Sequence, residues 1–149
     1  MRGTVAAVND AMFKVMNGVH RALRTVTGGR FGNSFMDMPV LELTTTGRKS
    51  GQPRSVMLTA PLVEGDRMVI IASRGGDDRH PTWFLNLRDH PEVQVAVQGG
   101  PARPMRARIV EGDERRTLWQ RVTSAHDNYA GYQRKTSREI PVVMLEPIA

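Results

Sequence analysis

Three cations gather around one glycine turn, and this segment is the part of the sequence best suited to binding an anion. Residues 44–54 read TTTGRKSGQPR, so that Arg48, Lys49 and Arg54 lie on or beside the turn. Backbone N–H groups in a glycine turn can converge on an anion, and an arginine can donate two hydrogen bonds to one phosphate or carboxylate. The segment lacks the Gly-Lys-Ser/Thr end of a Walker loop. It predicts a phosphate or carboxylate site, with a solvated basic hairpin as the alternative.

A second polar loop, residues 73–81, contains two adjacent glycines that would let a flat ligand approach the backbone. Ser73 follows an apolar run that predicts a strand, and its hydroxyl could hydrogen-bond a ring substituent. The alternative is a surface loop in which the arginines pair with Asp77 and Asp78.

Two tyrosines, Tyr129 and Tyr132, are spaced by three and would share one face of a helix. They could donate hydrogen bonds into a pocket, or they could be half-buried residues that seal a core. No nucleophile–base pair or carboxylate dyad is recognisable in the sequence. A hydrolase is therefore not favoured. The pattern favours a protein that binds a cofactor, because a cofactor can supply chemistry that the side chains lack.

The composition narrows the possible partners. Among 149 residues the formal net charge is +6 and the pI is about 10.7, which favours a phosphorylated cofactor, nucleic acid or an acidic membrane surface. There is no cysteine, and the four histidines form no HExxH motif, so we expect no metal. Acids are interspersed with the cations and aromatics are only 5%, which argues against a nucleic-acid-binding module. No spanning helix or secretory signal is recognisable, so a cytoplasmic location is expected.

The first thirty residues differ from the rest in charge. Five cations and one acid give residues 1–30 a net charge of +4 out of +6. Apolar residues at three- and four-residue spacing predict an amphipathic helix over 5–26, ahead of a main domain at 31–149. Its basic face is either solvated or in contact with an anionic membrane.

The remaining elements predict a mostly β fold that positions these side chains. Strands are expected at 39–46, 54–63, 67–73, 92–98, 102–110 and 140–145, and helices at 82–89, 113–125 and within 128–135. Thr82 and Asp113 are the expected helix caps. About six strands with short connections favour an antiparallel barrel or sheet with flanking helices.

Several motifs in this order resemble the deazaflavin-dependent nitroreductase family (flavin/deazaflavin oxidoreductase class A). They are LTTTGRKSGQPR at 43–54, ASRGG at 72–76, PTWFLNL at 81–87, the tyrosine pair, and IPVV at 140–143. The resemblance covers about 39–147 and implies an antiparallel split β-barrel similar to pyridoxamine 5'-phosphate oxidase.

The resemblance also implies coenzyme F420, an 8-hydroxy-5-deazaflavin with a phospholactyl-polyglutamate tail, and the residues that bind it. The tail-binding positions would be Arg48, Lys49, Ser50 and Arg54. The positions that line the deazaflavin would be Ser55, Val56, Met57, Leu58, Ile71, Ala72, Ser73 and Arg74, with Thr82, Trp83, Phe84, Leu85 and Asn86 closing over it.

By the same resemblance, Tyr129 and Tyr132 lie on the substrate side. Thr59 stands where some nitroreducing members carry an aromatic residue, and His126 where a further tyrosine can occur, which bears on substrate range. The implied reaction is hydride transfer from reduced F420 to a quinone, a nitro compound or a related acceptor, with Ser73, Tyr129 or Tyr132 as hydrogen-bond donor. An FMN-binding reductase on the same barrel is the alternative.

Overall fold

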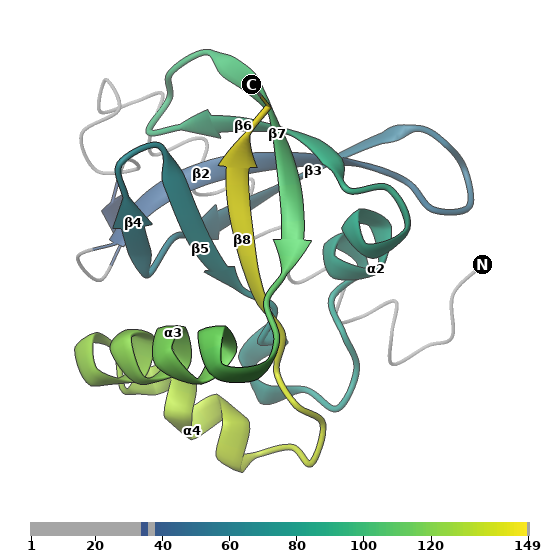
Figure 1. Ribbon diagram of the computed structural model, residues 1–149. Helices are drawn as coiled ribbons and strands as arrows, with labels where there is room; N and C mark the ends of the chain where they lie inside the picture. Colours follow the sequence, from purple (N-terminus) through teal and green to yellow (C-terminus); the bar gives the residue numbers. More distant parts are fainter. Residues whose placement is uncertain (1–33, 36–37, 149) are drawn as a thin grey trace.

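The computed structural model describes residues 34–35 and 38–148 (Figure 1). An eight-stranded antiparallel sheet forms the body of the protein, in the order β1-β2-β6-β7-β8-β5-β4, with β3 also paired to β2. The strands are β1 (Ser34–Phe35), β2 (Met38–Thr46), β3 (Pro53–Thr59), β4 (Leu62–Glu64), β5 (Arg67–Ile71), β6 (Glu92–Val97), β7 (Ala102–Ile109) and β8 (Val142–Pro147). The helices are a 3-10 turn η1 (Arg74–Gly76), α2 (Thr82–Asp89), α3 (Gly112–Ala125) and α4 (Asn128–Arg134).

The sheet curls into a barrel because one stretch of chain connects its two ends. β3 pairs with β2 and then continues through Ala60 and Pro61 into β4, which pairs with β5. Ala60 also donates its N–H to the Pro39 carbonyl at 3.0 Å, which holds this bend against β2. The predicted split β-barrel is therefore confirmed.

Alternate residues of the central strands enter two different apolar clusters. On β8, Val143 and Leu145 join the cluster that contains Phe84 of α2. Their neighbours on the same strand join the cluster that contains Leu118 and Tyr129, from α3 and α4. Both faces of β8 are covered, which explains why its sequence is a continuous apolar run instead of an alternation.

The strands and helices that the sequence predicts are largely confirmed, with two corrections among the strands. The expected strand at 54–63 is two strands, because the chain bends at Ala60 and Pro61. The short β1 was not among the expected strands. The helix predicted at 5–26 and the proposed domain boundary near residue 30 lie outside the described residues.

The expected helix caps are wrong in both cases. Pro81 occupies the N-cap of α2 and Thr82 is its first helical residue, as suits a helix entered from an extended proline. Glu111 occupies the N-cap of α3, and Asp113 lies in its first turn, where its charge complements the helix dipole. Of the helices in the described part, none is both long and apolar enough to cross a bilayer.

Candidate cofactor site

The cation-bearing turn is a tight connection between β2 and β3. After the last strand pair, Thr46 with Pro53, the Gly47 N–H donates to the Gln52 carbonyl and the Gly51 N–H to the Gly47 carbonyl, both at 2.8 Å. A Cβ on Gly47 would lie 2.5 Å from the Ser50 Oγ and 3.2 Å from the Gln52 carbonyl oxygen, so a larger residue there would have to displace the Ser50 side chain. The turn therefore has a defined conformation, on which its cations are placed.

The three cations of this turn are exposed and have no acidic partner among the described residues. Among the residues that the structure describes, Arg48, Lys49 and Arg54 form no salt bridge, and the Arg54 Nη2 reaches only the Ser50 Oγ at 3.5 Å. Most other arginines of the described chain pair with a carboxylate. The turn therefore concentrates positive charge that an external anion can neutralise.

Asn86 joins this turn to α2. Its Oδ1 accepts the Arg48 N–H at 3.0 Å, and its Nδ2 donates to the Thr45 Oγ1 at 3.1 Å. Asn86 and Thr45 are each only 2% exposed. Two motifs 38 residues apart in the chain thus meet through one buried amide, which fixes the turn relative to the helix.

Apolar side chains from β3 and α2 lie at the rim of one core cluster. Val56 and Leu58 of β3, and Trp83 and Leu85 of α2, are partly exposed and pack against the cluster that contains Phe84. Partly exposed apolar residues beside a cationic turn suit a ligand that has a flat ring and a charged tail.

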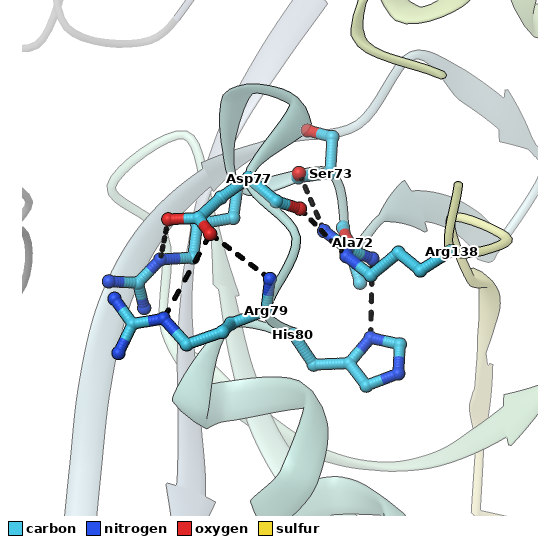
Figure 2. Close-up of polar contacts among 7 residues, drawn as sticks. Ala72, Ser73, Asp77, Arg79, His80 and Arg138 are labelled. Atoms are coloured by element: carbon cyan, nitrogen blue, oxygen red, sulfur yellow. Dashed lines mark hydrogen bonds and ion pairs between the residues drawn. The ribbon is translucent and has the colours of Figure 1, made fainter. Parts of the chain in front are cut away.

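The loop that follows β5 is held by charged hydrogen bonds (Figure 2). The Asp77 carboxylate accepts the Arg74 Nε–H at 3.3 Å and the Arg79 backbone N–H at 3.0 Å. The hydrogen bond from the Arg79 backbone is the main reason why the pKa of Asp77 lies below its usual range. Ser73 is buried at the start of η1, and its hydroxyl makes no capping hydrogen bond there.

The tyrosine pair lies on α4, which packs against η1. The Tyr129 hydroxyl is 3.3 Å from the Thr59 Oγ1 and donates to the Met38 Sδ at 3.5 Å. Burial raises the pKa of Tyr129. The half-buried Tyr132 ring meets it edge-on at 5.9 Å, and His126 ends α3 with its carbonyl accepting the Tyr129 N–H at 3.3 Å. The four residues expected on the substrate side are therefore grouped.

The chain is similar to known proteins of one family. The family model described as F420H2-dependent quinone reductase matches residues 16–147. The F420H2-dependent quinone reductase of Mycobacterium tuberculosis strain H37Rv is 42% identical over 132 residues, which cover 85% of this chain and 87% of that protein. The chain belongs to the F420H2-dependent quinone reductase family.

Solved structures of similar proteins share the family's fold. A structure of an F420H2-dependent reductase, FDR-A, superposes with a TM-score of 0.64 at 41% identity and covers 72% of this chain and 94% of its own. Another, described as a domain-swapped dimer, has a TM-score of 0.65 at 39% identity and covers 85% and 94%.

The cofactor of this oxidoreductase family is F420, which decides against the FMN and nucleic-acid alternatives. The turn fits a polyanionic tail, since its three cations are exposed and have no carboxylate partner among the described residues. Among the described residues, no group of three or more acids and histidines is placed to hold a metal ion.

The positions expected to bind F420 in this family differ in exposure. The exposed ones, whose side chains can reach a ligand directly, are Arg48, Lys49, Ser50, Arg54, Ser55 and Thr82. The partly exposed ones are Val56, Leu58, Arg74, Trp83 and Leu85. The buried ones are Met57, Ile71, Ala72, Phe84 and Asn86, where backbone contact or positioning is the role that burial allows, and Ser73, whose hydroxyl makes no capping hydrogen bond.

Two residues of the site carry no sequence signal that we recognised. Thr45 accepts the buried Asn86 amide from within an ordinary β-branched run. Arg138, in the connection between α4 and β8, donates to several carbonyls of the β5–η1 loop. Carbonyl acceptors are common to all residues, so such a contact leaves no motif.

Proposed function

We propose that this protein transfers a hydride from F420H2 to a quinone, with the F420 tail bound at the glycine turn of residues 47–54. The observation that supports this most directly is the set of three exposed cations without acidic partners, fixed to α2 through Asn86, in a chain of the F420H2-dependent quinone reductase family. A tail with several negative charges matches three cations better than a single phosphate does.

The residues of the turn would act mainly in binding. Arg48 and Arg54 can each direct two donors at phosphate or carboxylate oxygens, and Lys49 adds a point charge. Val56, Leu58 and Trp83 would contact the ring with partly exposed apolar surface. This arrangement leaves the acceptor to be recognised elsewhere, at the end of β3 and on α4.

On the acceptor side, the protein would orient the quinone and stabilise charge that develops on its oxygen. When bound, F420H2 supplies the hydride, and quinone reduction to the quinol also takes up a proton. Ser73 and Tyr132 are the donors proposed to stabilise the quinone oxygen in the transition state. The Tyr129 hydroxyl is buried against Met38 and Thr59, so we propose that it acts chiefly by holding Thr59 in place.

The proposal is tested by titrating oxidised F420 while following its fluorescence. Lys49→Ala and Arg54→Ala should each weaken binding about fivefold, because one exposed charge contributes roughly 1 kcal/mol. Arg121→Ala on α3 removes the same charge from an exposed arginine that faces Glu64, and it should leave the dissociation constant unchanged.

Two results would reject this function. One is an absence of F420 binding at micromolar protein. The other is an equal loss of affinity in the Arg121 control, which would mean that the cations act only through net charge. Turnover with F420H2 should then be compared for quinones, nitroaromatics and enones.

We also propose that nitro compounds are poorer acceptors than quinones for this chain. By the family resemblance, Thr59 stands where some nitroreducing members carry an aromatic residue and His126 where a further tyrosine can occur, and Thr59 is engaged with Tyr129. Thr59→Tyr should raise the ratio of nitroaromatic to quinone turnover. An unchanged ratio would remove Thr59 as a determinant of substrate range.

A peripheral contact of residues 1–30 with anionic membranes is the last part of the proposal. It is supported by the net charge of +4 in this segment and by the membrane solubility of quinones. Flotation of the full chain with phosphatidylglycerol vesicles should exceed that with phosphatidylcholine vesicles, and Arg21→Gln with Arg24→Gln should reduce the difference. Equal flotation on both vesicle types would exclude the contact.

A further inference from the structure

One guanidinium group organises the loop between β5 and α2. The Arg138 Nε donates to the Asp77 carbonyl at 2.8 Å, and its Nη2 donates to the Ser73 carbonyl at 2.8 Å. Its Nη1 lies 3.2 Å from both the Ala72 carbonyl and the His80 Nδ1. Figure 2 shows the loop folded around this single side chain. Arg138 thus binds the loop at its entry, its centre and its exit.

Arg138 binds backbone carbonyls, whereas most arginines of the described chain bind acids. In the described part of the chain no carboxylate lies within salt-bridge distance of it, and its partial burial lowers the pKa of its guanidinium. A charged donor strengthens a hydrogen bond to a neutral carbonyl. The arrangement therefore fixes the course of the backbone at the point where β5 ends and η1 begins.

The orientation of this backbone follows from the geometry of the peptide. A trans peptide places its N–H opposite its carbonyl, and the described residues contain no cis peptide. With the Ala72 and Ser73 carbonyls held by Arg138, the N–H groups of Ser73 and Arg74 are directed away from it. The Ser73 hydroxyl also points away from the guanidinium in Figure 2. Arg138 thus fixes the direction of these N–H groups. Its own side chain lies on the opposite side of the backbone from the side to which they point.

We infer that Arg138 is a positioning residue for hydride transfer, which holds the Ala72–Ser73 backbone where it contacts the deazaflavin ring. The inference rests on the proposed function. Two roles are thereby separated. The turn of residues 47–54 would determine the affinity for F420 by binding its tail, and Arg138 would determine the position of the deazaflavin ring. Loss of Arg138 should therefore lower kcat much more than it weakens binding.

The experiment compares kcat with F420 affinity in Arg138→Met, which keeps an unbranched apolar stem and removes every donor. We expect kcat with F420H2 and a quinone to fall about 10- to 100-fold, the effect of a small misplacement of reacting groups, while the dissociation constant for F420 changes less than about threefold. Arg138→Lys should recover only part of the rate, because one ammonium cannot span carbonyls that a planar guanidinium reaches together.

The matched control is Arg134→Met, an exposed arginine on α4 with no ion pair among the described residues. It should keep the kcat of the wild type. Circular dichroism of each variant gives the folded fraction by which kcat is normalised, and if Arg138→Met does not fold, the same comparison is made with Arg138→Lys.

Two outcomes would overturn the inference: a normalised kcat equal to that of the wild type, or losses of kcat and affinity of the same size. Failure of the wild type to bind F420 would instead reject the proposed function. The two failures are therefore distinguishable.

Discussion

Asn86 is a buried amide that we propose supports the F420 site by holding the glycine turn in place. Its oxygen and nitrogen are both used, by Arg48 and Thr45, and only 2% of the residue is exposed. Its contribution to F420 binding should therefore pass through the position of the turn. Asn86 would thus affect the same measurement as Lys49 while acting for a different physical reason.

Asn86→Ala should lower both stability and F420 affinity. It leaves the Arg48 N–H without its acceptor and removes the Thr45 Oγ1 hydrogen bond from the amide, which costs about 1–3 kcal/mol of unfolding free energy. Chemical denaturation gives the stability, and the fluorescence titration gives the affinity. Gln94→Ala, at an exposed position of β6, is the control. Stability equal to that of the wild type would show that the amide is dispensable.

His80 should make the stability of the loop sensitive to acid. Arginine has no acceptor, so the His80 Nδ1 must be unprotonated to receive the Arg138 Nη1–H. Burial, with Arg138 and Arg88 nearby, lowers the pKa of His80 below its usual 6.5, while Asp77 and Asp78 act on Arg138 from the same loop.

Because the unfolded state binds the His80 proton more readily, stability is fully present above pH 6.5 and falls as the pH decreases toward the folded-state pKa. Thermal unfolding between about pH 5 and pH 8 should show this loss. His80→Gln should show a weaker dependence, and the exposed His90→Gln should retain that of the wild type. If the stability of His80→Gln depends on pH as that of the wild type does, the loss of stability in acid comes from other groups.

At the scale of elements, η1 and α4 approach so closely that only glycine fits between them. A Cβ on Gly76 would lie 2.7 Å from the Tyr132 carbonyl and 3.0 Å from the Lys135 Cβ. This contact joins the loop that carries Ser73 to the helix that carries the tyrosines. The proposed cofactor side and acceptor side therefore share one packed boundary.

Gly75 and Gly76 allow the packing to be measured apart from backbone strain. Both have positive φ, 64° and 87°, but nothing lies within 4 Å of a Cβ on Gly75. Gly75→Ala should cost about 1–2 kcal/mol for the left-handed conformation, and Gly76→Ala about 1–3 kcal/mol more because of overpacking. Chemical denaturation of the two variants gives the difference. Equal losses would mean that α4 can shift to make room.

The elements themselves were largely predictable from the sequence, for reasons that particular residues make clear. Val93, Val95 and Val97 alternate with polar residues, so β6 was recognisable from its period. Pro61 was less informative, because an apolar run continued across it and concealed the bend between β3 and β4.

The candidate site was predictable only in part. The glycine turn was recognisable from its cations. Asn86 was identified through the family resemblance, and its role as the link between the turn and α2 is visible only in the fold. Arg138 was not identified at all, since its partners are carbonyls brought near by tertiary structure. Sequence patterns report local conformation, and these contacts span 61 to 66 residues.

At the scale of the whole molecule, F420 should stabilise the fold as a unit. A ligand that binds only the folded state at 100 times its dissociation constant adds about 2.7 kcal/mol, which corresponds to a rise of roughly 5–10 °C in Tm for a chain of this size. Far-ultraviolet circular dichroism should show this rise as a single shifted transition. Lys49→Ala should show a smaller rise at the same F420 concentration, and an equal rise in both proteins would indicate a tail site elsewhere.

The position of β8 has a consequence for how the protein is made. β8 is the last of the described strands in the chain, yet it lies between β5 and β7 and supplies side chains to both apolar clusters. A nascent chain that ends before Val142 lacks the strand that connects the two halves of the sheet, so β5 and β7 each present an unpaired edge during translation. The barrel therefore cannot close until β8 has been synthesised, and until then the unpaired edges of β5 and β7 are open to aggregation.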